Sequence, residues 1–380
     1  MTENKIEINK DKMTALFLSL ARQDSLSFQE MRVAYRLKIE LQSLGFEVIE
    51  DGAGAHYGSE CGNLYGYRKG TAGRDPVLFS AHMDTVAPGL AKKPQLKDGR
   101  IESDGTTVLG ADDICGIVEI LEGIRAAKED PKGCGDIEVL FTIGEEAYGQ
   151  GAKVFDFSRV RSSEAYVLDM SGPPGAAARK APSIIGFEVE VTGKAAHAGF
   201  APEEGRNALQ AAAKAIARIP QGHVSAATTL NVGRIEGGTA DNIIASQIRC
   251  SGEVRSFDHE EAVATIDMVK KIFNEESDSI GAKVNFDSHV YIRAYETAEE
   301  APVCRCFLRA CRQLGLPGEL RATHGGSDNN VFFQKGLSGI VLSCGMYGTH
   351  STEEYTSVED LAQGARLVAA IIGQRQEEIP

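Results

Sequence analysis

The sequence predicts an α/β protein that carries a second, smaller α+β domain. Apolar strands alternate with helix-period segments over most of the chain, and one compact run of a different pattern interrupts this alternation. The alternating part predicts a mixed, partly parallel sheet flanked by helices, and the interruption predicts an inserted unit of βαββαβ order. We expect residues 1–183 and 295–380 to form the larger domain, and residues 184–294 to form the inserted one.

Composition bounds the class of protein. The 380 residues exceed one typical core and favour two domains. The formal net charge of -14 disfavours nucleic acid and anionic membranes as partners. There is no apolar run of 18 residues, and residues 1–28 lack the pattern of a signal peptide. Together with eight scattered cysteines, these features predict a cytoplasmic protein with reduced thiols, including those of "CRCFLRAC", which we interpret as a helix and not as a zinc knuckle.

The larger domain begins with helices and continues with strands. Helix-period apolar residues between 11 and 45 predict two helices, the second ended by Gly45. Residues 110–130 predict a loop that runs into a helix. The expected strands are residues 47–51, the pair 62–70 and 75–82, and the buried strands 136–143, 163–170 and 338–344.

Polar side chains gather where these strands end. His82 ends one strand, Glu145 and Glu146 follow another, and Asp169 ends a third. His350 lies in the loop after the last strand. Because ligands of open α/β sheets bind beyond the carboxyl ends of the strands, we expect these groups to share one site.

Each of these groups also has a purely structural explanation. His82 and Asp84 can be a strand end that enters a polar loop, and Asp112 can cap the helix that follows it. Glu145 and Glu146 can be solvated, Asp169 can cap a turn, and His350 can be a loop histidine. The joint pattern favours chemistry, because two divalent ions about 3.5–4 Å apart need such nitrogen and oxygen donors with one shared carboxylate.

The inserted domain carries three further candidates. Its expected elements are strands at 183–192, 228–238, 247–257 and 281–292 and helices at 207–219 and 259–277. His197 follows the first of these strands, Asn242 lies between the second and third, and Arg255 lies on the third.

Seven motifs together resemble the co-catalytic zinc metallopeptidase family, and most closely its peptidase T-like branch. The motifs occur in order along nearly the whole chain: "HMDTV", "GADDICG", "TIGEEAYGQGA", "LDMSG", "TGKAAHAG", "HGGSDNNVF" and "GTHSTEEY". The family also includes deacylases and aminoacylases. The resemblance implies a catalytic domain and an inserted lid and dimerisation domain.

The resemblance also implies a role for each candidate of the larger domain. His82 and Asp169 would hold one metal ion, Glu146 and His350 the other, and Asp112 would bridge them, with a cis peptide bond after it. Glu145 would act as general base. Asp84 would orient the ring of His82 through its far nitrogen.

In the inserted domain, the resemblance implies contacts with substrate. His197, from a partner subunit, would stabilise the developing oxyanion. Asn242 and Arg255 match positions that contact substrate. The structural alternatives are a turn cap for His197, a turn residue for Asn242 and a strand-face ion pair for Arg255.

Two departures from the family pattern concern specificity. Ile114 and Cys115 stand where many relatives carry Lys or Arg. His324 stands directly before the two glycines, where tripeptidases typically carry Arg, and Arg321 lies three residues earlier. A neutral histidine does not reproduce bidentate recognition of a carboxylate by arginine, so these departures bear on peptide length and terminus.

From the resemblance we expect a dinuclear-metal exopeptidase that hydrolyses short peptides from the N-terminus. The type that the resemblance favours is a tripeptide aminopeptidase. The expected cofactors are two divalent ions, Zn²⁺ first, with Co²⁺ and Mn²⁺ also suited to these donors. The expected partners are a short peptide and a second copy of the chain, which joins through the inserted domain to form a homodimer. An N-acyl amino acid deacylase and a non-catalytic binding protein are the alternatives.

Overall fold

The computed structural model describes residues 6–71, 75–128 and 134–374, which form two compact units. The larger unit contains the residues up to Lys180, Glu296–Thr323 and those from Ser327 onward. The smaller unit contains Ala181–Tyr295 and the short segment His324–Gly326. The short segment is an addition to the inserted domain that the sequence analysis expected at 184–294.

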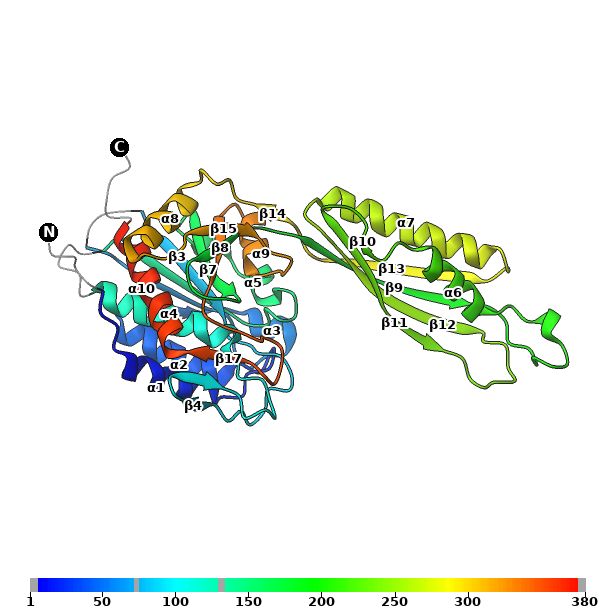
Figure 1. Ribbon diagram of the computed structural model, residues 1–380, viewed down its shortest axis with the longest axis horizontal. Coiled ribbons are helices and arrows are strands. Elements are labelled where there is room, and N and C mark those ends of the chain that lie inside the picture. The colour runs from blue at the N-terminus through cyan, green and yellow to red at the C-terminus, as the bar shows by residue number, and fades with distance from the viewer. Residues whose placement is uncertain (1–5, 72–74, 129–133, 375–380) are drawn as a thin grey trace. The chain divides into compact units, whose positions relative to one another are not determined.

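The larger unit is built on a mixed nine-stranded sheet (Figure 1). The strands run in the order β1-β2-β6-β3-β7-β16-β8-β14, and β15 pairs with β8. Pairing is parallel from β6 through β3 and β7 to β16, so the predicted fold class, with its partly parallel sheet, is confirmed. The strands are β1 (Glu47–Glu50), β2 (Leu64–Arg68), β3 (Val77–His82), β6 (Ile137–Thr142), β7 (Glu164–Met170), β8 (Ala176–Ala181), β14 (Tyr295–Glu296), β15 (Glu319–Ala322) and β16 (Ser338–Ser343).

One expectation about this sheet was wrong. Residues 62–70 and 75–82 form strands β2 and β3, but these two strands are not a pair, because β6 lies between them. Strand β6 is buried along its whole length and is apolar except for Glu138 and Thr142, so it can take a central position with neighbours on both edges. Sequence adjacency alone did not indicate this order.

Helices cover the sheet of the larger unit. Helix α4 packs on β3 and β7, and α10 packs along α4, which also contacts α1 (Figure 1). The helices are α1 (Lys10–Ala21), α2 (Met31–Ser43), α3 (Ala53–Tyr57), α4 (Ala111–Lys128), α5 (Gln150–Val154), α8 (Pro302–Leu314), α9 (Asp328–Gln334) and α10 (Val358–Gln374). A small sheet of β4 (Gln95–Lys97), β5 (Arg100–Glu102) and β17 (Tyr355–Ser357) was not expected from the sequence. The "CRCFLRAC" segment lies in α8, and all eight cysteines are free and buried.

The smaller unit is an antiparallel five-stranded sheet with two helices on one face (Figure 1). Alternate residues of its central strands, such as Phe187, Val189, Ile248 and Cys250, form the core beneath the helices. The strand order is β10-β11-β12-β9-β13. The elements are β9 (Ser183–Thr192), α6 (Ala208–Arg218), β10 (Gly222–His223), β11 (Thr228–Gly237), β12 (Gln247–Ser256), α7 (His259–Asp278) and β13 (Lys283–Ile292). The short strand β10 is the one addition to the expected βαββαβ order.

No helix within the described parts of the chain has both the length and the apolar character needed to cross a membrane.

Candidate metal centre

The candidate ligands of the larger unit meet at one edge of its sheet. His82 is the last residue of β3, Asp169 lies near the end of β7, and Glu146 follows β6. These three strands are neighbours and run parallel, so their carboxyl ends share one edge. Asp112 lies at the start of α4, where its backbone is not helical (φ -84°, ψ 100°), and His350 lies in the loop between β16 and β17.

Asp112 lies between the two histidines. Its Oδ1 is 2.9 Å from His82 Nε2, and its Oδ2 is 3.3 Å from His350 Nε2. His82 Nε2 is also 3.8 Å from Asp169 Oδ1, and His350 Nε2 is 2.9 Å from Glu146 Oε1. The five side chains therefore form two overlapping groups with Asp112 common to both.

The donor set suits divalent cations. The group His82, Asp112 and Glu146 offers one nitrogen and two carboxylate oxygens within 4.8 Å of one another. The side chains of Asp112, Glu146 and Asp169 are only 10–11% exposed, so their like charges are poorly screened by solvent. Such a concentration of buried carboxylates with two imidazoles is the chemistry that a pair of divalent ions would neutralise.

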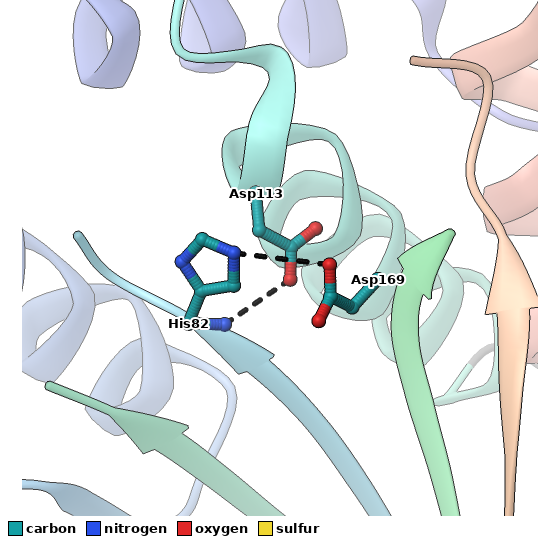
Figure 2. Close-up of side chains that lie close together, drawn as sticks. All are labelled: His82, Asp113 and Asp169. Atoms are coloured by element: carbon teal, nitrogen blue, oxygen red, sulfur yellow. Dashed lines mark hydrogen bonds and ion pairs between the residues drawn. The ribbon is translucent and has the colours of Figure 1, made fainter. Parts of the chain in front are cut away.

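Asp113 also lies beside His82, but its oxygens have backbone partners. Figure 2 shows Asp113, His82 and Asp169 together, and these three could in principle form a ligand group. Asp113 Oδ2 accepts a hydrogen bond from the His82 amide at 3.1 Å, and Oδ1 accepts one from the Gly116 amide at 3.2 Å. These contacts hold the end of β3 against the start of α4. The peptide bond between Asp112 and Asp113 is cis, as the resemblance implied.

Asp84 contacts more than the ring of His82. His82 Nδ1 lies 2.9 Å from the Asp84 backbone carbonyl and 3.3 Å from Asp84 Oδ1. The Asp84 carboxylate, which is fully buried, accepts hydrogen bonds from the Glu145 amide at 2.9 Å and the Glu146 amide at 3.1 Å. The backbone carbonyl thus fixes the histidine tautomer at least as directly as the carboxylate, and the carboxylate holds the loop that carries both glutamates.

The protonation states reflect crowding of negative charge. Burial, and then the charge of Asp169, raise the pKa of Glu145 well above its usual range. Hydrogen bonds to Asp112 and Glu146 raise the pKa of His350 to about 10. Burial alone would raise the pKa of Asp112, but hydrogen bonds from His350 and His82 outweigh it and lower that pKa. Burial alone would lower the pKa of His82, but hydrogen bonds to Asp112 and Asp84 outweigh it and raise that pKa.

Two buried glutamates that the sequence analysis did not single out hold the same loops from behind. Glu354 accepts hydrogen bonds from the Gly110 amide at 2.7 Å and the Asp112 amide at 3.0 Å. Glu30 accepts one from the Gly144 amide at 2.9 Å, next to Glu145. Neither had a local signal, because both lie in polar stretches that are typical of solvent-exposed helix ends and loops.

In the smaller unit, His197 and Asn242 lie side by side. A two-residue bridge pairs His197 with Ile243, and the Ala198 amide donates to the Asn242 carbonyl at 2.9 Å. His197 Nδ1 accepts hydrogen bonds from the amides of Gly199 and Phe200 at 3.1 and 3.2 Å. A neutral His197 therefore carries its proton on Nε2, where it is available to a ligand.

Arg255 lies at the other end of the same sheet. It pairs with Ile184 near the start of β9, whereas His197 and Asn242 lie beyond the Thr192–Gln247 end. About eight residue steps of ~3.3 Å separate the two ends, or roughly 26 Å. Arg255 bonds Glu253 at 2.7 Å and the His324 carbonyl at 2.9 Å, so the ion pair considered as its structural alternative is present.

His324 and Arg321, which the sequence analysis compared with the arginine of tripeptidases, belong to different units. His324 belongs to the smaller unit, where its ring lies 4.9 Å from that of Phe257. Arg321 is exposed in the larger unit, and its Nη2 lies 3.4 Å from the carbonyl of Ser171, two residues after Asp169.

Comparison with known proteins identifies the family. Two family models match: "Peptidase family M28" over residues 63–220 and "Peptidase dimerisation domain" over residues 180–280. An uncharacterised Bacillus subtilis protein, YqjE, is 35% identical over 96% of this chain and 98% of its own length. The solved structure of aminopeptidase PepT from Bacillus cereus has a TM-score of 0.92 and 37% identity, and it covers 97% of this chain and 100% of its own. A Staphylococcus aureus tripeptidase has a TM-score of 0.94 and 32% identity, and it covers 97% of this chain and 99% of its own.

The fold and these similarities define the class first: this protein is a peptidase, and therefore a hydrolase. The chain belongs to the co-catalytic metallopeptidase family, in its peptidase T-like branch.

Proposed function

We propose that this peptidase is an aminopeptidase for short peptides, with tripeptides as its preferred class, and that it works with two divalent ions. Zn²⁺ is the proposed ion, and Co²⁺ and Mn²⁺ suit the same donors. The proposed ligands are His82, Asp112, Glu146, Asp169 and His350. The observation that supports this most is the position of Asp112, which directs one oxygen to His82 and the other to His350.

When bound, two divalent ions supply Lewis-acid polarisation of the scissile carbonyl and make the attacking water more acidic. Glu145 then takes the proton from that water and delivers it to the leaving amine. Asp84 keeps Glu145 and Glu146 in place, because its carboxylate accepts hydrogen bonds from both of their backbone amides.

His197 is proposed to donate its Nε2 proton to the oxyanion, and Asn242 and Arg255 to contact substrate. An extended tripeptide spans only about 11 Å. Within one chain, roughly 26 Å of sheet separates His197 and Asn242 from Arg255, so one tripeptide cannot contact all three. We therefore infer that each site uses His197 and Asn242 of the partner subunit, in a homodimer formed through the smaller unit. The match of residues 180–280 to a peptidase dimerisation domain supports this.

Mixed dimers test this sharing. Glu145→Gln and His197→Ala chains, each inactive alone, are unfolded and refolded together. Sharing predicts that heterodimers contain one intact site, so a random mixture recovers about a quarter of wild-type activity. Absence of recovery in a mixture proven to contain heterodimers contradicts sharing.

The reaction class is tested with a matched panel of di-, tri- and tetrapeptides and N-acetyl amino acids, with zinc, cobalt or manganese supplied. We expect release of the N-terminal residue, fastest from tripeptides, as the names of the Bacillus cereus and Staphylococcus aureus relatives suggest. Hydrolysis of N-acetyl amino acids alone would move the protein to the deacylase alternative. No turnover with any of the ions would favour the binding-protein alternative. The buried free thiols support the proposed cytoplasmic location.

A further inference from the structure

Glu354 is almost completely buried, and both of its oxygens contact the segment that carries the central carboxylate of the candidate metal centre. Glu354 is only 1% exposed. Oε2 accepts from the Gly110 amide at 2.7 Å, and Oε1 accepts from the Asp112 amide at 3.0 Å. Hydrogen bonds from backbone amides to a carboxylate are charge-assisted and directional, so they restrict the backbone of Asp112 and thereby the direction of its side chain.

The same loop that supplies Glu354 also supplies His350. The loop is closed at its base by reciprocal backbone hydrogen bonds between Tyr347 and Tyr355, of 2.9 and 3.0 Å, and by the stacking of their rings at 4.8 Å. His350 takes a left-handed backbone conformation (φ 62°) within this loop and faces Asp112 Oδ2. One loop thus contacts Asp112 twice, through His350 at the side chain and through Glu354 at the amide.

The surroundings of Glu354 keep it in this position. Gly110 has φ +78°, and a Cβ there would lie 3.2 Å from Lys92 Nζ, so the segment approaches the lysine closely. Lys92 is 4% exposed, and its Nζ lies 3.2 Å from Thr85 Oγ1. Burial raises the pKa of Glu354 to about 7, and the hydrogen bonds from the Asp112 and Gly110 amides oppose that rise. Lys92 lies close enough for the charge of Glu354 to raise its pKa, although burial lowers that pKa to about 8 overall.

We propose that Glu354 is a positioning residue that fixes Asp112 between His82 and His350. Tight binding of one of the two divalent ions then depends on Glu354. The proposal rests on the metal centre proposed above. The hydrogen bonds of the Glu354 side chain come from backbone amides, so its effect passes through the backbone of Asp112. Partners of this kind, one step behind the ligands, typically change metal affinity or activity by about 10–100-fold.

The neighbouring Glu353 offers a matched control. It is exposed, lies in the same loop and carries the same charge, and no hydrogen bond or ion pair of its side chain occurs among the described residues. Glu354→Gln replaces one acceptor oxygen by an NH2 donor that faces the N–H of a backbone amide. Glu353→Gln makes the same change in solvent. Wild type and both variants are stripped of metal and dialysed against buffers of defined free Zn²⁺. Zinc bound per chain is then measured by mass spectrometry, and the unfolding midpoint of each metal-free protein by circular dichroism.

We expect wild type and Glu353→Gln to bind two zinc ions with affinities within about two-fold of each other. We expect Glu354→Gln to lose at least about ten-fold in affinity for one of the two ions. If Glu354→Gln does not fold, Glu354→Asp, which keeps the charge but is one methylene shorter, is used and is expected to show the same loss.

A folded Glu354 variant with wild-type zinc affinity at both sites overturns the proposal, even if its unfolding midpoint is lower, because that result would mean a purely structural role. Wild type that binds no zinc would instead overturn the proposed metal centre, before any variant is compared.

Discussion

Two buried glutamates of the larger unit, Glu354 and Glu119, lie in contrasting surroundings. Each is only 1% exposed. Glu354 accepts two backbone hydrogen bonds beside the candidate metal centre. Glu119 lies on α4 against Gly364 of α10, and neither of its oxygens has a hydrogen-bond partner among the described residues. Burial is the same in the two cases, but the bonding is not.

The difference shows what burial of a carboxylate means in this protein. At the candidate metal centre, the segments that carry the proposed ligands donate backbone hydrogen bonds to the buried carboxylates of Asp84, Asp113, Glu30 and Glu354. Such groups preorganise a site. Burial, and next the charge of Asp360, raise the pKa of Glu119 well above its usual range, which favours its neutral form. Its side chain fills space between α4 and α10.

The largest expected effect comes from Asp84→Asn. The backbone N–H groups of Glu145 and Glu146 donate to the two carboxylate oxygens of Asp84. Asparagine would place its NH2 donor against one of these two N–H groups. We expect kcat for a tripeptide to fall by about 100-fold or more at saturating metal, with the far-ultraviolet circular dichroism unchanged. Wild-type kcat in a folded Asp84→Asn protein would show that these bonds do not position the catalytic loop.

Binding of a cation should change the protonation of groups at the candidate metal centre, but not that of Glu119. His350 has a pKa of about 10 without metal, so it is protonated at pH 7.5 and must lose that proton to become a ligand. Zinc binding is therefore expected to release protons and to tighten as pH rises from 6 to 8. Calorimetry at pH 7.5 in buffers of different ionisation enthalpy measures the release, and His350→Ala should release fewer protons. Binding without proton release would refute this account of His350.

A smaller effect is expected from Glu119→Gln, and this substitution should stabilise the protein. Unfolded Glu119 loses its proton near pH 4.5, whereas the folded protein retains it, so wild-type stability falls as pH rises above 4.5 until the folded pKa is passed. Glutamine has no such cost. We expect the variant to gain about 1–3 kcal/mol in free energy of unfolding at pH 8, and the gain to shrink toward pH 5. Urea denaturation at both pH values measures it, and a gain independent of pH would contradict a neutral Glu119.

The smallest effect is expected at a partly exposed carboxylate. Glu102, whose side chain is 27% exposed, pairs with Lys97 at 2.7 Å and with Arg100 at 3.2 Å. Exposed ion pairs contribute little, so Glu102→Gln should leave both kcat and the urea midpoint unchanged within error. A clear loss of kcat or a lower urea midpoint would show that this ion pair contributes more to activity or stability than exposed pairs usually do.

Much of the fold followed from local patterns. Apolar runs located β3, β6 and β7, and the histidine and carboxylates at their ends lie together because parallel strands share an edge. The order of β2, β6 and β3 did not follow, because pairing is decided by burial in the sheet and not by adjacency in the chain.

The supporting carboxylates were beyond sequence reasoning for a related reason. Glu354 lies 242 residues from Asp112, and Glu30 lies 114 residues from Gly144. Their partners are backbone amides, which every residue except proline possesses, so no residue type in the partner segment signals the contact. Only the tertiary structure brings them together.

The most direct test of the account is metal-dependent tripeptide hydrolysis by wild type and Glu145→Gln. Both proteins are stripped of metal and titrated with Zn²⁺, while bound zinc and release of the N-terminal residue are measured on the same samples. The account predicts that wild-type activity appears as the chain approaches two zinc ions, and that Glu145→Gln binds two ions but loses kcat by at least about 100-fold. Full wild-type activity without bound metal, or full activity of zinc-loaded Glu145→Gln, would contradict it.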